Sequence, residues 1–212
     1  MKSARSCNNV VQLPSVKPYS ESCEQNRAPI LDVLRIELAG RSRLLEIGSG
    51  TGQHAVYFAP EFPRLSWQTS DRSDMHAGIR AWLDDQGSAN ILPPLALDVG
   101  RDKWPTTCYD AIYSANTVHI MDWSEVEHLY AGIGSVLEDG GVFCLYGPFN
   151  YQGSYTSPSN ARFDQWLKAR DPSSGIKDFE ALQELAEKAG LELIRDYEMP
   201  ANNRTLVWSK HS

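Results

Sequence analysis

The chain has 212 residues, enough for one domain with a sizeable core. Hydrophobic residues make up 42% and charged residues 22%, an ordinary balance for a globular protein. Lys plus Arg is 20 and Asp plus Glu is 27, so the net charge is −7. An acidic chain without a Lys/Arg cluster is a poor general binder of nucleic acids and anionic membranes, so the composition favours small-molecule chemistry.

The cysteines and the first residues indicate a compartment. None of the four cysteines (Cys7, Cys23, Cys108 and Cys144) belongs to a CxxC pair, which predicts free thiols in a reducing environment. The N-terminal stretch has no apolar core of the kind found in signal peptides, and no apolar run reaches the length of a membrane span. A cytoplasmic protein is therefore expected.

The first predicted element is a loose polar arm over residues 1–18, followed by a single domain over residues 19–212. That domain opens with an amphipathic helix in NRAPILDVLRIELAG, with Pro29 in its first turn and Gly40 at its end. Strand and helix patterns then alternate. Strands are predicted at 44–47, 65–69, 95–99, 111–115 and 142–146, and helices at 53–59, 75–85 and 124–137. Ser124 is the expected N-cap of the last helix, with Glu127 completing a capping box.

The last third of the chain has a different pattern. Residues 150–178 read as a long, lid-like insertion around a short helix, and loops of this length in compact domains are often functional. A helix is predicted over 178–189, and strands over 191–197 and 205–209 form a hairpin-like end. Alternating strands and helices predict an α/β fold in which helices cover both faces of a parallel sheet. Ligands of such sheets bind beyond the carboxyl ends of the strands.

The stretch LLEIGSGTGQHA predicts a strand, a glycine-rich turn and a helix. Its spacing is ExGxGxG, so the third glycine, Gly52, comes one residue earlier than in the dinucleotide motif GxGxxG. Glu46, directly before the turn, would repel a pyrophosphate and attract an ammonium group. S-adenosylmethionine (SAM) carries an ammonium and a sulfonium and no phosphate, so the turn favours SAM over NAD. A glycine-rich packing turn without a ligand is the alternative.

Two further acids follow predicted strands. Asp71 comes after the second strand, where a carboxylate can accept hydrogen bonds from both ribose hydroxyls of SAM or of NAD. Asp98 ends the predicted third strand, where it can accept from an adenine amino group while the Val99 N–H donates to the ring. Taken alone, an Asp at a strand end is more often a helix cap or a turn former, but together with Glu46 and Asp71 it favours the adenine contact.

With these features the chain resembles the class I SAM-dependent methyltransferases. It is also similar to the DUF938 family of unknown function, which includes the animal methyltransferase-like 26 proteins. NRAPIL, WQTSD, NTVHI, LYGPF and TSPSNARFDQWLKARDPSSGIKD carry that resemblance over roughly residues 20–210. It implies a Rossmann-like, mostly parallel seven-stranded sheet whose antiparallel last strand lies beside the fifth. The expected cofactor-binding residues are Asn26, Arg27, Glu46, Gly48, Ser49, Gly50, Asp71, Arg72, Asp98, Val99 and Asn116.

Candidate catalytic residues follow the fourth and fifth strands. Methyl transfer leaves a neutral thioether, so the enzyme chiefly aligns the nucleophile, and a base helps where that nucleophile carries a proton. His119 is the candidate base, or else it only shapes the pocket, and Tyr146 stacks on an acceptor or merely packs. Arg27 either pairs with the SAM carboxylate or is solvated. Arg170 and Asp171 are expected either to form an ion pair that holds the insertion as a lid or to grip the substrate.

The leading hypothesis is therefore a SAM-dependent methyltransferase of a small-molecule O, N or S nucleophile, acting as a monomer or homodimer. The sequence SANTVH after the fourth strand has no NPPY-type motif, which argues against methylation of nucleic-acid bases. No metal site is predicted, because no His, Asp and Glu residues show ligand spacing. A SAM-binding regulator or scaffold without turnover is the alternative, and a nicotinamide oxidoreductase is a third, weaker one.

Overall fold

A computed structural model describes residues 17–211 of the chain. Most of the predicted arm, with Cys7, lies outside the described residues, but its last two residues pack against helix α3 (His76–Gln86). Lys17 Nζ lies 2.5 Å from Asp85 Oδ2, and the Trp82 indole N–H donates to the Pro18 carbonyl at 2.6 Å. The three described cysteines are free thiols. Between residues 17 and 211, no helix has the length and apolarity needed to cross a membrane.

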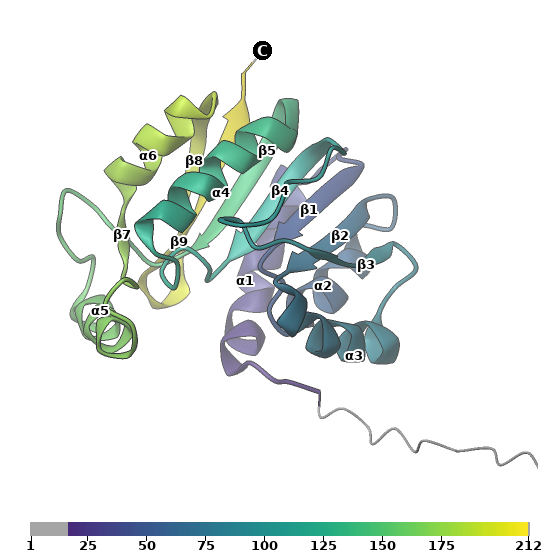
Figure 1. The fold of residues 1–212 in the computed structure, drawn as a ribbon, viewed down its shortest axis with the longest axis horizontal. Helices are drawn as coiled ribbons and strands as arrows, with labels where there is room; N and C mark the ends of the chain where they lie inside the picture. The colour runs from purple at the N-terminus through teal and green to yellow at the C-terminus, as the bar shows by residue number, and fades with distance from the viewer. Residues whose placement is uncertain (1–16, 212) are drawn as a thin grey trace, which may run out of the picture.

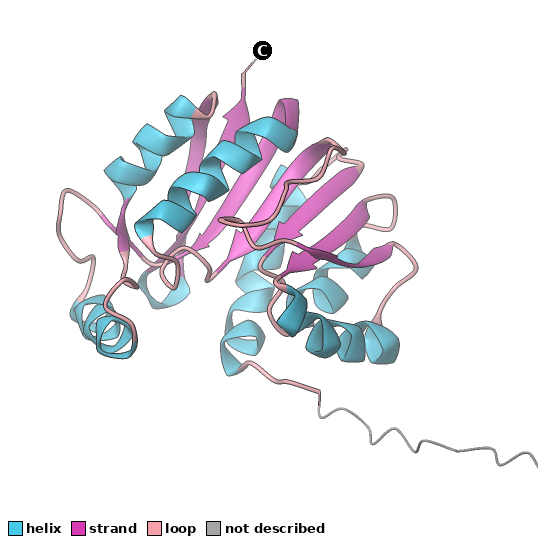
Figure 2. Cartoon of the chain, in the orientation of Figure 1, coloured by secondary structure: helices cyan, strands magenta, loops and turns pink. Residues whose placement is uncertain are grey.

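A seven-stranded sheet forms the centre of the molecule, with strand order β3-β2-β1-β4-β5-β9-β8 (Figures 1 and 2). Its strands are β1 (Arg43–Ile47), β2 (Ser66–Asp71), β3 (Ile91–Ala96), β4 (Tyr109–Ala115), β5 (Leu137–Gly147), β8 (Leu191–Met199) and β9 (Asn203–Lys210). The first five strands pair in parallel, and β9 lies antiparallel between β5 and β8. The predicted fold class, including the antiparallel last strand beside the fifth, is confirmed.

Helices cover both faces of this sheet. On one face α1 (Glu21–Glu37) and α2 (Gln53–Phe58) pack over the strands, with α3 beside α2; on the other lie α4 (Trp123–Val136) and α6 (Phe179–Lys188). Successive side chains of a strand point to opposite faces. Leu44 therefore joins the core under α1, and Leu45 joins the core under α4. The carboxyl ends of β1 to β5 point to the lower edge of the sheet in Figure 1, where the long loops gather.

Two predicted helix starts are wrong. Helix α1 begins at Glu21, capped by the Ser20 hydroxyl, so Pro29 lies inside the helix rather than in its first turn. Helix α4 is capped by Asp122 instead of Ser124. The Asp122 carboxylate accepts from the Glu125 N–H at 2.8 Å, and the Glu125 carboxylate accepts from the Asp122 N–H at 2.9 Å. The capping box thus exists, two residues earlier than its predicted position.

The third strand also differs from its prediction. It runs from Ile91 to Ala96 instead of 95–99 and includes Pro93 and Pro94. Because β3 is an edge strand with β2 on one side only, prolines without an N–H are tolerated there. Asp98 and Val99 consequently lie in the turn that follows the strand rather than at its end.

The insertion at residues 150–178 contains a 13-residue helix, α5 (Pro158–Arg170), capped by the Ser157 hydroxyl. Its two ends are joined by a short parallel pair, β6 (Phe149–Asn150) and β7 (Lys177–Asp178). The predicted ion pair between Arg170 and Asp171 is wrong. The Arg170 guanidinium lies over the Trp166 ring at 4.5 Å, and Asp171 accepts from the Ser173 N–H at 2.9 Å.

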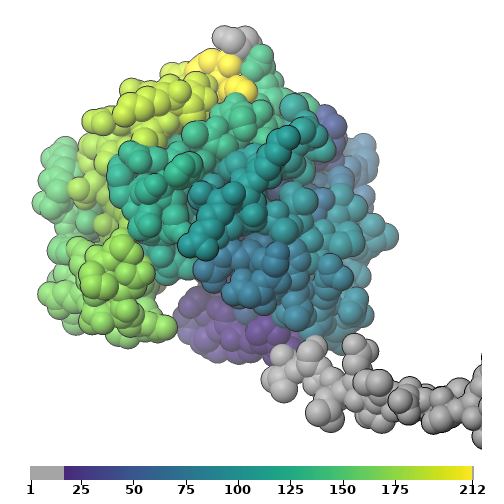
Figure 3. Space-filling view, viewed as in Figure 1, coloured from purple at the N-terminus to yellow at the C-terminus, as the bar shows by residue number. Residues whose placement is uncertain are grey.

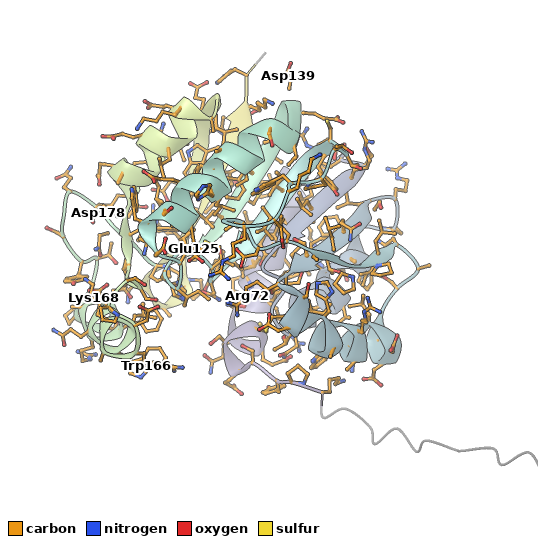
Figure 4. All side chains as sticks on the ribbon, in the orientation of Figure 1. Arg72, Glu125, Asp139, Trp166, Lys168 and Asp178 are labelled. Carbon is orange, nitrogen blue, oxygen red and sulfur yellow. The ribbon has the colours of Figure 1, made fainter. Side chains whose placement is uncertain are left out.

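A buried carboxylate stabilises the insertion in place of that ion pair. Asp164, 1% exposed, accepts from Lys168 Nζ at 2.6 Å, from the Tyr155 hydroxyl at 2.7 Å and from the Ile176 N–H at 2.7 Å. Burial opposes its ionisation, but these donors hold the pKa of Asp164 below its ordinary value. Figure 4 shows Lys168 and Trp166 on this helix, at the edge of the molecule.

Candidate functional site

Two adjoining cavities open at the carboxyl ends of the strands. The first, of about 440 Å³, lies over β1, β2 and β4, at the point where the strand order reverses. The second, of about 340 Å³, lies between α1, α5 and the turn before β9. Ser22, Asn116 and Phe163 line both. Figure 3 shows the molecule hollowed between the green α5 segment and the purple N-terminal helix.

Most of the predicted site residues meet in the first cavity. It is lined by Gly48, Ser49, Gly50, Asp71, Arg72, Asp98, Val99, Asn116 and His119. Arg72 and Glu125, both labelled in Figure 4, lie at its mouth from opposite sides of the switch point. The sequence brings these residues together because the ends of β1, β2 and β4 and the turn after β3 meet at one edge of the sheet.

The turn after β1 depends on glycine at two positions. The N–H groups of Gly48 and Ser49 both donate to the Ser70 carbonyl, at 3.0 and 2.9 Å, which holds the turn against β2. At Gly48 (φ +72°) a Cβ would lie 2.5 Å from Thr117 Cγ2. At Gly50 (φ +58°) a Cβ would have no neighbour within 4 Å among the described residues. Gly48 therefore allows close packing, and Gly50 presents bare backbone to the cavity.

Asp71 ends β2 and lines the first cavity. Its carboxylate accepts from the Gly50 N–H at 2.7 Å and from the Arg72 N–H at 2.8 Å. Burial raises the pKa of Asp71, and these two donors oppose that rise. One N–H bond to each oxygen leaves lone pairs free, so the carboxylate can still accept hydrogen bonds from a pair of hydroxyls in the cavity.

Glu46 precedes the turn, as predicted, and its side chain is buried. It is 2% exposed and lies beneath the turn, where its Oε2 accepts from the Ser49 hydroxyl at 2.9 Å and the Trp67 indole N–H at 3.0 Å. Burial raises the pKa of Glu46 to about 7. Among the described residues, Glu46 belongs to the lining of neither cavity. Glu46 thus shapes the turn through Ser49 and Trp67, and its attraction for a ligand ammonium stays a prediction.

Asn26 and Arg27 lie outside the lining of the first cavity. Asn26 lines the second cavity, and its Oδ1 lies 2.8 Å from His54 Nε2. Arg27 pairs with Glu24 at 2.7 Å and lies over the Tyr57 ring at 4.4 Å. Because α1 begins at Glu21, these neighbouring residues point in different directions, about 100° apart around the helix. Arg27 is therefore engaged at the surface of α1 rather than in the first cavity.

His119 is buried between the two walls of the site. His119 is 6% exposed. The Phe163 ring of α5 packs edge-on against its imidazole, with 5.3 Å between the two ring centroids. Burial, aided by the charge of Lys177, lowers the pKa of His119 to about 4, so the imidazole is neutral near pH 7. Its Nδ1 has no hydrogen-bond partner within residues 17–211. Because His119 also lines the first cavity, its neutral ring can accept a proton or a hydrogen bond from a ligand there.

Tyr146 and Asn116 form the boundary with the second cavity. Tyr146, predicted as catalytic, lines the second cavity, and burial raises the pKa of its hydroxyl to about 12. Asn116 has a left-handed backbone (φ +60°), and its N–H donates to the Tyr146 carbonyl at 2.9 Å. Asparagine tolerates this conformation better than most residues, and such outliers concentrate at functional sites.

Several lining residues are not evident from sequence patterns. Cys23 and His54 line the first cavity, Asn160 lines the second, and Phe163 lines both. Asn160 and Phe163 belong to the SNARFD stretch that carries the family resemblance, which is the only sequence signal for them. Within the described part of the chain, no group of three His, Cys, Asp or Glu side chains is placed to hold a metal ion.

A family profile described as a protein of unknown function, DUF938, matches residues 17–210. The chain belongs to the DUF938 family. The match spans both cavities, so the cavity-lining residues are part of the DUF938 domain.

Solved methyltransferases share the fold of this DUF938 chain. An O-methyltransferase family protein from Burkholderia thailandensis superimposes with a TM-score of 0.77 at 13% identity, over 87% of this chain and 56% of its own. An O-methyltransferase family 2 protein from Planctomyces limnophilus, in complex with apigenin, superimposes with a TM-score of 0.76 at 20% identity, over 89% of this chain and 57% of its own. Human N-acetylserotonin methyltransferase, in complex with SAM, superimposes with a TM-score of 0.69 at 14% identity, over 88% of this chain and 55% of its own. The chain thus has the class I methyltransferase fold and spans a little over half of these chains.

Proposed function

We propose that this chain is a SAM-dependent methyltransferase whose acceptor is a small molecule with an O, N or S nucleophile. The observation that carries the proposal is the first cavity, in which the bare backbone of Gly50 and the carboxylates of Asp71 and Asp98 line one space. Its residues suit SAM: Asp71 can accept from the ribose hydroxyls, and Asp98 with the Val99 N–H lies beside it for the adenine ring. When bound, SAM supplies an electrophilic methyl group and leaves as a neutral thioether.

The chain itself orients the acceptor and receives its proton. The second cavity holds the acceptor, and Asn116 and Phe163, which line both cavities, limit where its nucleophilic atom can lie. His119 lines the first cavity next to that atom and accepts a proton or a hydrogen bond from it as a neutral imidazole. The α5 helix closes over the reacting groups through the contact of Phe163 with His119 and keeps water away from them.

Binding and turnover are tested separately. Calorimetry with SAM, S-adenosylhomocysteine and NAD is expected to show binding of the first two only, and NAD binding without SAM binding would overturn the proposal. Methyl transfer from labelled SAM into a small-molecule extract then separates the enzyme from a SAM-binding regulator or scaffold. Label in a small molecule identifies an enzyme, and SAM binding without any labelled product identifies the alternative.

A further inference from the structure

The walls of the second cavity carry no charged side chain. Its 13 lining residues include asparagine, serine, glutamine, tyrosine, proline, alanine and phenylalanine, and none within residues 17–211 is acidic or basic. The first cavity, by contrast, has Asp71, Arg72, Asp98 and Glu125. A charged ligand would find no charged partner on these walls, so an uncharged molecule fits the second cavity better.

A buried chain of hydrogen bonds fixes the direction of the Asn26 amide. His54 Nε2 lies 2.8 Å from Asn26 Oδ1, and the Tyr113 hydroxyl lies 3.2 Å from His54 Nδ1. Burial lowers the pKa of His54 to about 4, so the ring is neutral and carries one N–H. Because Asn26 Oδ1 only accepts, Nε2 is the donor, and Nδ1 accepts from Tyr113.

This arrangement turns the Asn26 amide NH₂ away from His54, and Asn26 lines the second cavity together with Tyr146. Burial raises the pKa of the Tyr146 hydroxyl, and the Asn26 side chain acts against that rise, as a donor to the phenolic oxygen does. A hydroxyl oxygen that accepts from an amide keeps its own proton for another partner. Tyr146 is thus set up to donate into the second cavity.

The opposite wall offers an acceptor. Asn160, 5% exposed, donates its side-chain amide to Thr156 Oγ1 at 2.9 Å and to the Asn202 carbonyl at 3.0 Å. Both amide hydrogens are used, so the carbonyl oxygen of Asn160 is left to accept from a ligand. Asn160 comes from α5 and Tyr146 from β5, which places a donor and an acceptor on different walls of a cavity of about 340 Å³.

On this basis we propose that the second cavity binds a small uncharged molecule that carries both a hydrogen-bond acceptor, met by Tyr146, and a donor, met by Asn160. The proposal rests on the proposed function in one respect, that this molecule is the methyl acceptor. Tyr146 and Asn160 touch the ligand, whereas Asn26, His54 and Tyr113 act through Tyr146 as positioning residues. Volume favours a compact ligand, since about 340 Å³ is near the lower end for ligand pockets.

Three probes of one shape test the charge preference: benzamide, benzoate and benzylamine, which are neutral, anionic and cationic near neutral pH. Ligand-observed NMR on the full chain, with S-adenosylhomocysteine present, is expected to show benzamide binding about tenfold more tightly than either ion. Equal or tighter binding of an ion, or no binding of benzamide, would overturn the proposal. Ion-exchange fractions of a small-molecule extract, treated with labelled SAM, are expected to give product in the neutral fraction, and product in a charged fraction would contradict it.

Paired variants test the site. Tyr146→Phe is expected to weaken benzamide binding about tenfold, because it removes one hydrogen-bond donor. Tyr130→Phe is the matched control, since the Tyr130 hydroxyl is buried without a partner in the core beneath α4, and its benzamide affinity stays at the wild-type value. Equal benzamide affinities of the wild type, Tyr146→Phe and Tyr130→Phe would show that Tyr146 does not contact the ligand. The ¹⁵N shifts of the His54 ring report its tautomer: Nε2–H is expected, a mixture is expected in Tyr113→Phe, and Nδ1–H in the wild type would overturn the positioning chain.

Separate measurement of SAM binding keeps the two proposals apart. Calorimetry is expected to show that SAM affinity is the same in wild type and Tyr146→Phe, because Tyr146 lies outside the first cavity. Benzamide binding without SAM binding would refute the proposed function and leave the charge preference of the second cavity standing. SAM binding together with a preference for benzoate or benzylamine would refute the charge preference of the second cavity and leave the proposed function standing.

Discussion

The two cavities differ in how the chain builds them. The first is made mainly of residues at the ends of strands or directly after them, such as the glycine turn, Asp71 and Asn116. The second is assembled from α1, α5 and the turn at 200–203, which are far apart in the chain. Among residues 17–211, the first cavity is lined by charged groups and the second is not. A cavity built from strand ends is visible as local motifs, whereas one built between distant helices is not.

A branched side chain at Gly50 should have the largest effect and should act on the first cavity alone. Gly50→Val places Cβ branches in the open space beside the turn, at a φ of +58° that valine strongly disfavours. SAM affinity measured by calorimetry is expected to fall about 100-fold or more, beyond the cost of backbone strain of about 1–3 kcal/mol. Wild-type affinity in this variant would show that the turn does not face SAM.

Gly140→Val is the matched control for backbone strain. Gly140 has a φ of +73°, and a Cβ added there would likewise have no neighbour within 4 Å among the described residues. It lies near the start of β5 and follows Asp139, which Figure 4 labels at the top of the molecule, away from the lower edge of the sheet. Its valine variant is expected to lose similar stability in urea unfolding while keeping its SAM affinity.

Replacement of His119 tests the point where the two cavities meet. His119→Ala is expected to lower kcat about 100-fold while SAM affinity is unchanged, the size expected for loss of a proton acceptor. With a pKa of about 4, the imidazole is neutral through the neutral range, so the His119-dependent part of the rate is lost only as pH falls towards 4. The exposed His128 serves as control, and His128→Ala should keep the wild-type kcat. A wild-type kcat in His119→Ala would leave the residue a structural role only.

The sequence predicts the order of the strands and the lining of the first cavity better than it predicts the positions of individual side chains. Strand order follows from alternating patterns and family resemblance, and nine of the predicted site residues line the first cavity because the sheet brings strand ends together. The positions of Glu46 and Arg27 were not predictable from spacing. Glu46 turns under the loop to meet the indole N–H of Trp67, 21 residues later, and Arg27 is directed by the true start of α1.

Long-range contacts explain the other misses. The contact of Phe163 with His119 joins the insertion to the loop after β4, and no local period in the sequence encodes it. The chain from Tyr113 through His54 to Asn26 links β4, α2 and α1 in the same way. The β3 boundary was wrong because Pro93 and Pro94 look like strand breakers, although an edge strand accepts them.

Glu46 offers a smaller, pH-dependent test of the first cavity. Its pKa is raised by burial from 4.5 to about 7, so the protonated form is favoured in the folded state. Its contribution to stability is present below its unfolded pKa and is lost as pH rises to about 7, a loss of about 3 kcal/mol. Glu46→Gln keeps an oxygen for Ser49 and Trp67 and cannot ionise.

Urea unfolding at about pH 4 and about pH 8 measures this effect. Glu46→Gln is expected to raise the free energy of unfolding at the higher pH and to change it little at the lower one. Glu127→Gln, on the exposed face of α4, should show no such pH-dependent difference. A gain of the same size at both pH values would mean that Glu46 ionises normally. Unchanged SAM affinity in Glu46→Gln would support a shaping role for Glu46, and weaker SAM binding would restore the predicted attraction for the ammonium.

The smallest expected effect is that of loosening the insertion at residues 150–178, which should weaken ligand binding in the second cavity more than in the first. Asp164→Asn weakens the bonds from Lys168, Tyr155 and Ile176, a local cost of about 1–3 kcal/mol. Amide exchange over residues 150–178 should accelerate, and benzamide affinity should fall further than SAM affinity, because α5 supplies Asn160 to the second cavity alone. Asp171→Asn, whose partner is the neighbouring Ser173, is the control. Equal losses for SAM and benzamide would mean that α5 supports both cavities alike, since Phe163 reaches both.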